Sequence, residues 1–188
     1  GAGGSFALVV IDLDDFKAIN DTLGQSIGDQ FLKAVAERLR LCVGPADLLA
    51  RIGGDEFAIV QRSTDQPAAA TRLARSVAET LGAPFTIDGH RAVVCASMGI
   101  AVAPQDGRDP NRLLQNAELA LHRAVELHDG AAALAPGLQQ HAGEALIDTA
   151  RAPRRGAVDD EGCVGLRKGA EYLVDLVAEG IDVVEIRV

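Results

Sequence analysis

The sequence is short of basic residues, and that shortage limits what the protein can bind. Eighteen Lys and Arg stand against 27 Asp and Glu, which gives a formal net charge of −9. A surface of this charge repels phosphate backbones and anionic lipid, so we expect no nucleic-acid partner and no direct membrane contact. A nucleotide ligand would need metal ions or local hydrogen-bond donors to offset the repulsion.

Cysteine and long apolar runs are also scarce. Cys42, Cys95 and Cys163 are odd in number, far apart and without the spacing of a metal site. We therefore expect reduced thiols and a cytoplasmic location. No apolar run is long enough to cross a bilayer, and no signal-peptide pattern is found. The 188 residues, 48% of them hydrophobic, are typical of one globular domain with a substantial core.

Strand-like and helical patterns alternate along most of the chain. An apolar run over residues 6–12 predicts a buried strand that ends near Asp12. Hairpin turns are expected at Gly53-Gly54 and at Asp88-Gly89, because glycine accepts the positive φ angles of two-residue turns. Helical periodicity, closed by glycine or proline, predicts helices over residues 15–23, 27–43, 67–82 and 109–130.

This order favours an α+β fold of the ferredoxin-like or cyclase type, with a central, mainly antiparallel sheet flanked by helices. One helical crossover separates the first strand from the first hairpin, and such a crossover usually brings its two strands side by side. We therefore expect Asp12 and Asp55 to meet at one edge of the sheet.

Three motifs carry more specific information. They are "VVIDLDDFKAINDTLGQSIGD" at residues 9–29, "ARIGGDEFAIV" at residues 50–60, and "ASMGIAVAPQDG" at residues 96–107, followed by "LLQNAELAL". Together, and in this order, they resemble the GGDEF family, the diguanylate cyclases. The resemblance covers residues 6–128. It implies a domain that joins two GTP molecules into the bacterial second messenger cyclic di-GMP and releases pyrophosphate.

The resemblance also implies a divalent cofactor and partners. Two subunits face each other in the family, each holding one GTP, so a homodimer is expected for catalysis. Mg²⁺ or Mn²⁺ would neutralise the phosphates. A sensory domain in a longer parent protein is a further expected partner. We expect residues 1–130 to form the nucleotide-binding domain, 131–165 a helix and a polar linker, and 166–188 a helix and strand that complete the same domain.

Four residues match the metal and catalytic positions of the family. Asp12, Asp55 and Glu56 correspond to its catalytic acids, and the same three with Leu13 correspond to its metal ligands. The alternative for the acids is an ordinary role in a strand end or turn, because Gly-Gly-Asp is common in hairpins. The bare backbone of the two turn glycines would let a phosphate or metal approach closely.

Further residues match the nucleotide-binding positions. Asp15, Phe16 and Lys17 correspond to the loop that contacts the triphosphate, where a helix N-terminus favours an anion. Asn20 and Asp29 correspond to the residues that read guanine, and a carboxylate suits the N–H groups on its Watson–Crick edge. The alternatives are helix capping for Asn20 and Asp29 and a solvated charge for Lys17.

The chain departs from the family at several phosphate contacts. Val125 and Asp129 stand where the family has basic residues, and Arg167 or Lys168 would have to replace them. Gly44 stands where an inhibitory product site needs arginine, so we expect no product inhibition there. The alternative function is thus a weak or inactive module that binds GTP as a sensor or regulatory partner. A cyclase for another base is disfavoured by Asp29, and a phosphodiesterase by the lack of a second metal-rich motif.

Overall fold

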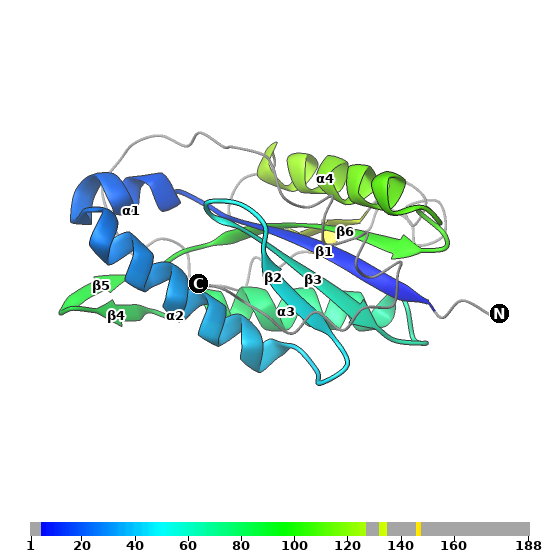
Figure 1. Cartoon of the computed structure of the whole chain (residues 1–188), viewed down its shortest axis with the longest axis horizontal. Coiled ribbons are helices and arrows are strands. Elements are labelled where there is room, and N and C mark those ends of the chain that lie inside the picture. Colours follow the sequence, from blue (N-terminus) through cyan, green and yellow to red (C-terminus); the bar gives the residue numbers. More distant parts are fainter. Residues whose placement is uncertain (1–4, 127–131, 135–145, 148–188) are drawn as a thin grey trace.

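The structure is a computed structural model that describes residues 5–126, 132–134 and 146–147 (Figure 1). The elements follow one another as β1 (Phe6–Leu13), α1 (Phe16–Leu23), α2 (Gln25–Cys42), β2 (Leu48–Arg51), β3 (Glu56–Arg62), α3 (Ala68–Gly82), β4 (Phe85–Ile87), β5 (His90–Ala92), β6 (Ala96–Ala103), α4 (Pro110–Glu126), β7 (Ala132–Leu134) and β8 (Leu146–Ile147). No helix among the described residues is long and apolar enough to span a membrane.

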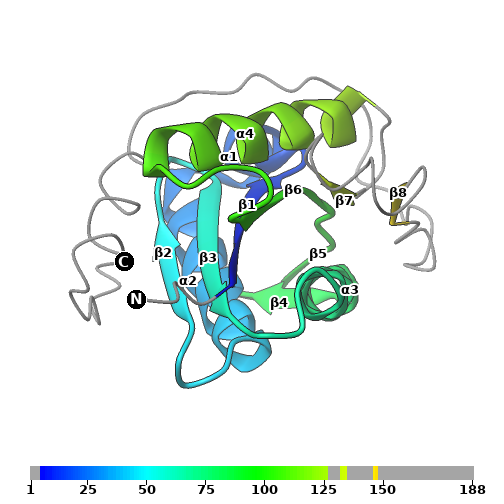
Figure 2. The same cartoon turned by 90° about the vertical axis from the view of Figure 1, so that its right-hand side faces the viewer.

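The main sheet has the strand order β2-β3-β1-β6-β7-β8, with β4 and β5 forming a separate hairpin. The strand β1 pairs antiparallel with both β3 and β6, and among the described strands only β7 pairs in parallel, with β6. Helices α2 and α3 cover one face of the sheet and α4 covers the other (Figure 2). The predicted α+β class, with a mainly antiparallel central sheet flanked by helices, is confirmed.

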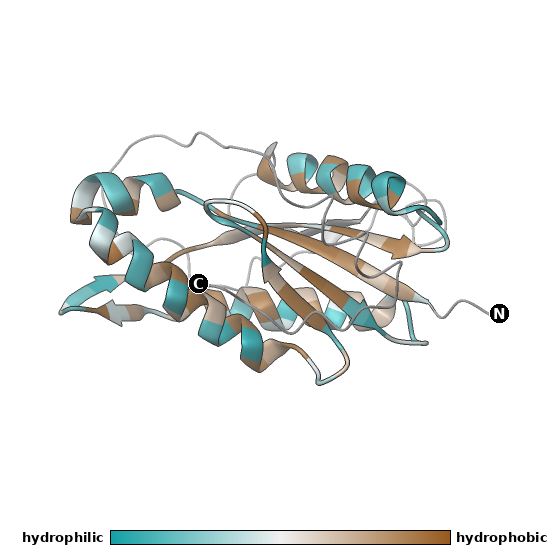
Figure 3. Ribbon diagram, viewed as in Figure 1, coloured by the Kyte–Doolittle hydropathy of each residue, from teal (hydrophilic) through white to brown (hydrophobic). Residues whose placement is uncertain are grey.

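The strand β1 is buried on both faces, as its apolar sequence predicts. Alternate side chains point to opposite sides of a strand. Val9 and Ile11 therefore pack with α2 and α3, whereas Leu8 and Val10 pack against α4. In Figure 3 the central strands are mostly hydrophobic, whereas the helices carry hydrophobic and hydrophilic residues together. Burial on both faces fixes the register of β1 against its neighbours.

The crossover from β1 through α1 and α2 leads to β2, which is not beside β1. The return strand β3 lies between them. The expectation that the crossover joins neighbouring strands is wrong, because β2 and β3 form a hairpin that inserts its second strand next to β1.

The two predicted hairpin turns differ. Asp88 and Gly89 both have positive φ, of 50° and 80°, as a two-residue turn requires. Neither Gly53 nor Gly54 has positive φ, and β2 and β3 are joined by four residues, 52–55. The expectation of a two-residue turn at the paired glycines is therefore wrong. After Gly89 the chain forms two separate strands, because β5 ends at Ala92 and β6 begins at Ala96.

The segment after α4 differs in part from its prediction. Its two described pieces, β7 and β8, are strands rather than parts of a helix. The parallel pairing of β7 with β6 extends the sheet beyond β6. The predicted helix and strand over 166–188 lie outside the described residues, as do Asp129, Cys163, Arg167 and Lys168. Among the described residues, Cys42 and Cys95 form no disulfide.

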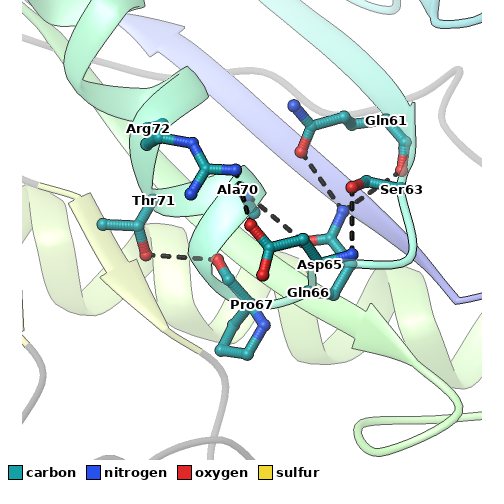
Figure 4. Close-up of polar contacts among 8 residues, drawn as sticks. All are labelled: Gln61, Ser63, Asp65, Gln66, Pro67, Ala70, Thr71 and Arg72. Carbon is teal, nitrogen blue, oxygen red and sulfur yellow. Dashed lines mark hydrogen bonds and ion pairs between the residues drawn. The ribbon is translucent and has the colours of Figure 1, made fainter.

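Side-chain contacts fix the two ends of α3. At its start, the Gln66 amide accepts a hydrogen bond from the Ala70 N–H at 3.2 Å and donates one to Gln61 Oε1 at 3.2 Å (Figure 4). At its end, the Arg38 guanidinium donates to the carbonyls of Thr80 and Pro84 and covers the Phe85 ring at 3.5 Å from the centroid. A cation is favourable there, because the helix C-terminus carries partial negative charge.

Helix α4 packs closely against β6 at Gly99. A Cβ atom on Gly99 would overlap backbone atoms of Ala117 and Leu121 and would lie 2.8 Å from the Leu121 Cβ. We predict that Gly99→Ala lowers the free energy of unfolding by about 2–3 kcal/mol, because a buried helix must move off the sheet. Urea denaturation followed by circular dichroism measures the change.

The matched control is Gly54→Ala, because a Cβ on Gly54 would meet nothing within 4 Å. Its free energy of unfolding should stay within about 1 kcal/mol of the wild type. Equal stability of the two variants would show that α4 does not need the bare backbone of Gly99.

Candidate functional site

Three acidic residues meet where β1 ends and β3 begins. Asp12 is the register partner of Glu56, and the Leu13 N–H donates to the Asp55 carbonyl at 3.3 Å. The expectation that Asp12 and Asp55 come together is therefore confirmed. Asp55 reaches Asp12 because β3, which follows Asp55, pairs with β1. The first strand of the hairpin, β2, is not paired with β1.

Burial disturbs the titration of two of these acids. The pKa of Asp12 is raised from 3.8 to about 7, chiefly by desolvation and secondly by the neighbouring charges of Asp55, Glu56 and Asp14. Burial also raises the pKa of Asp55, against the opposing effects of a backbone hydrogen bond and the Arg51 charge. Carboxylates in such a cluster are stabilised by a cation, because a positive charge favours their ionised form.

The loop that carries Asp55 is held by Arg51, which the sequence analysis did not single out. Its guanidinium donates to the Gly53 carbonyl at 3.1 Å and to the Gly54 carbonyl at 2.7 Å. Across the same loop, the Ile52 N–H donates to the Glu56 carbonyl at 2.9 Å. The arginine at the start of the motif thus fixes the backbone next to the acids.

The two glycines of the motif have different roles. A Cβ on Gly53 would come within 2.5 Å of Glu56 Oε2 and 3.2 Å of Glu56 Cβ, so this glycine gives the Glu56 side chain its place. A Cβ on Gly54 would point into open space. Both leave a bare backbone beside the acids, as expected, but only Gly53 is required by a neighbouring side chain.

Asp14 and Ser97 form a second feature that the sequence analysis missed. The Asp14 N–H donates to the Cys95 carbonyl at 3.0 Å, and its carboxylate accepts from Ser97 Oγ at 2.9 Å. Ser97 is buried on β6, directly opposite Asp12. In the sequence, the feature that could have pointed to Asp14 is the presence of three acids within the four residues 12–15. The serine tethers the loop that follows Asp12 to the sheet.

The start of α1 lies immediately after this loop. Asp15 has a φ of 59° and takes the N-cap position without a side-chain capping bond. The Phe16 side chain is buried and stacks on Phe31, so only its backbone remains for a ligand. Lys17 is exposed. The first N–H groups of any helix lack intrahelical partners and suit an anion.

Asn20 lies on α1, and Asp29 lies on α2. Neither caps a helix, because α1 begins at Phe16 and α2 begins at Gln25 with Gly24 before it. The capping alternative is therefore wrong for both residues. Among the described residues, no group donates a hydrogen bond to the buried Asn20 Oδ1. Asp29 is exposed and follows Gly28, which lies against the Asn20 carboxamide.

Other predicted positions lie apart from this cluster or have structural partners. Val125, which stands in place of a basic residue of the family, is 42% exposed on α4. Near Gly44, Asp47 accepts from the Gly44 N–H at 2.9 Å and from the Arg62 N–H at 3.0 Å, and thereby holds the turn before β2. Within residues 5–126, 132–134 and 146–147, no three His, Cys, Asp or Glu side chains could hold a metal alone.

Comparison with curated proteins gives relatives that are bacterial signalling proteins. The chain is 44% identical over 126 residues to an uncharacterized signaling protein of Caulobacter vibrioides, and covers 16% of it. It is 41% identical over 121 residues to the bifunctional diguanylate cyclase/cyclic di-GMP phosphodiesterase MucR of Pseudomonas aeruginosa, and covers 18% of it. It is 37% identical over 130 residues to the diguanylate cyclase TpbB of the same species, and covers 30% of it. These alignments use 64–69% of this chain.

Solved structures agree with the sequence comparison. The GGDEF domain of TpbB from Pseudomonas aeruginosa superposes with a TM-score of 0.68 at 36% identity, covering 70% of this chain and 83% of that one. A sensory box/GGDEF family protein from Caulobacter crescentus superposes with a TM-score of 0.64 at 43% identity, covering 68% and 82%. The family described as "Diguanylate cyclase, GGDEF domain" matches residues 2–130. The chain therefore belongs to the GGDEF family of diguanylate cyclase domains.

Proposed function

We propose that this chain is a diguanylate cyclase domain that condenses two GTP molecules into cyclic di-GMP and releases pyrophosphate. The observation that carries the proposal is the meeting of Asp12, Asp55 and Glu56 beside the bare backbone of Gly53 and Gly54. The family supports the same activity. The chain spans 14–30% of the length of the curated relatives, so the activity of the whole protein is part of this proposal.

The residues fit a divalent cation, Mg²⁺ or Mn²⁺. Mg²⁺ is commonly bound through one or two carboxylates together with substrate phosphates, so a complete side-chain cage is not needed. Asp12 and Asp55, with the Leu13 carbonyl and Glu56, would hold it, and the raised pKa values of both aspartates are what a cation would relieve. The metal would neutralise charge on the transferring phosphate.

The chain's own residues would orient the nucleotide. Asn20 and Asp29 offer a carboxamide and a carboxylate to the guanine base. Lys17 and the backbone at Asp15 and Phe16 would contact the triphosphate at the start of α1. In the reaction, each ribose 3′-oxygen bonds to the α-phosphorus of the opposite GTP, the bond from that phosphorus to pyrophosphate breaks, and Glu56 or water takes up the hydroxyl proton. Because one chain offers one such site, two chains are needed.

A module that binds GTP without turnover is the second candidate. Val125, which stands in place of a basic residue, motivates it, because each charge-assisted contact to phosphate is worth about 1.5–3 kcal/mol. Calorimetry that shows GTP binding by a protein that makes no cyclic di-GMP would support this candidate over the cyclase.

The activity has a direct test. Purified protein incubated with GTP and Mg²⁺ should yield cyclic di-GMP, measured by chromatography, and GTP should be preferred to ATP. Asp55→Ala should lower the rate about a hundredfold or more, because it removes charge stabilisation at the phosphate.

The control is Asp65→Asn, which breaks only an exposed ion pair with Arg72 and should leave the rate unchanged. An Asp55→Ala variant as active as the wild type would contradict the assigned site. A dimeric, GTP-bound wild type without product would contradict the cyclase and favour the binding module.

The acidic cluster also predicts how stability depends on pH without metal. The pKa of Asp12 is about 7 in the folded chain and 3.8 ordinarily, so the folded state binds the proton more tightly. The contribution of Asp12 to stability is then fully present below pH 4 and is lost as pH rises to about 7. Asp12→Asn should therefore be less sensitive to pH than the wild type over this window.

Urea denaturation of both proteins at pH 5 and pH 8 measures the difference. The free energy of unfolding of the wild type, relative to that of Asp12→Asn, should be lower at pH 8 than at pH 5. Mg²⁺ should stabilise the wild type more at pH 8, because it competes with the proton. Equal pH dependence in the two proteins would mean that Asp12 is not buried among like charges.

A further inference from the structure

Gly28 lies on α2 at the point where the Asn20 side chain of α1 reaches it. It is buried, and a Cβ atom on it would overlap Asn20 Oδ1 and lie 2.9 Å from Asn20 Cγ. The next atom, Phe16 Cζ, would be at 3.4 Å, which is ordinary contact. The space that a side chain at position 28 would occupy is therefore filled by the Asn20 carboxamide.

This glycine does not serve to bring two backbones together. At Gly99 a Cβ would strike the backbone of a neighbouring helix, so a larger residue would push the helix away. At Gly28 the atoms in the way belong to the end of a side chain that can turn aside. An alanine at position 28 would thus displace the carboxamide before it disturbs the packing of α1 on α2.

The carboxamide has little to do for the fold in this position. Its Oδ1 is buried, yet accepts no hydrogen bond from the residues that the structure describes. Buried polar atoms normally have partners, and an exception calls for a reason such as a ligand. An N–H group of a nucleobase would supply the missing donor, and Asp29 stands exposed next to Gly28.

We propose that Gly28 is a positioning residue of the nucleotide site. Its lack of a side chain leaves the space in which the Asn20 carboxamide takes the orientation that binds the base. The inference rests on the proposed function. The size of residue 28 then sets how tightly guanine is held and how well it is distinguished from adenine, without contact between Gly28 and the reacting atoms.

The test is a double-mutant cycle on the full chain. Calorimetry with GTP and Ca²⁺ measures binding by the wild type, Gly28→Ala, Asn20→Ala and the double variant. Gly28→Ala should weaken GTP binding about five- to tenfold, the value of one hydrogen bond, and should reduce the preference for GTP over ATP. In the Asn20→Ala background it should change nothing further. Folding should be preserved, because alanine favours a helix more than glycine.

Ser26→Ala is the matched control, because Ser26 is exposed on the same helix. It should bind GTP as the wild type does. Equal weakening by Gly28→Ala in both backgrounds would overturn the inference, since the glycine would then act without Asn20. Unchanged affinity of Gly28→Ala, where Asn20→Ala binds more weakly, would overturn it as well.

A second readout needs no nucleotide. The chain has three asparagines, Asn20, Asn111 and Asn116, whose side-chain amide signals can be separated by NMR. Gly28→Ala should move the Asn20 signal and leave the other two in place. An unmoved Asn20 signal overturns the inference even where GTP binds. If the wild type binds no GTP, the proposed function fails, and this signal alone decides whether Gly28 positions Asn20.

Discussion

The antiparallel pairing of β1 with β3 is the constraint on which the site depends. Both strands are apolar on both faces, so α2 and α3 on one side and α4 on the other fix their register. A slip of one residue would turn every side chain of β1 to the opposite face. Asp12 would then lose Glu56 as its partner, and the acids would no longer share one end of the sheet.

Polar groups that the fold does not itself use gather around this end. Burial and the neighbouring carboxylates raise the pKa of Asp12, and the Asn20 oxygen is buried without a hydrogen bond from the described residues. Such groups cost stability unless a partner satisfies them. Hydrogen bonds hold the neighbouring loops in place: Arg51 donates to the glycine loop, and Ser97 donates to Asp14. A metal ion beside the carboxylates and a nucleobase beside Asn20 would satisfy these polar groups, as the proposed function requires.

Local patterns in the sequence predicted local structure well. The buried run of β1, the helix that ends at Gly24 and the turn at Asp88-Gly89 follow from burial periodicity and backbone preference, and all three are confirmed. The prediction that the first crossover joins neighbouring strands was wrong, because β3 lies between β2 and β1. The order of elements along the chain does not determine which strand of a hairpin pairs with β1. The role of Gly28 could not be predicted from the sequence either, because it depends on a contact with Asn20 from another helix. Arg51 and Ser97, which support the loops beside the acids, lie within the quoted motifs, but nothing in the sequence pattern singled them out.

The account's central claim is that the acidic end of β1 and β3 binds a nucleotide together with a divalent metal. A crystal structure with a non-hydrolysable GTP analogue and Mg²⁺ tests it most directly. The account predicts metal density between the carboxylates of Asp12 and Asp55, with the triphosphate beside the start of α1 and the base near Asn20 and Asp29. A nucleotide bound elsewhere, or bound with no metal at these two carboxylates, would contradict it.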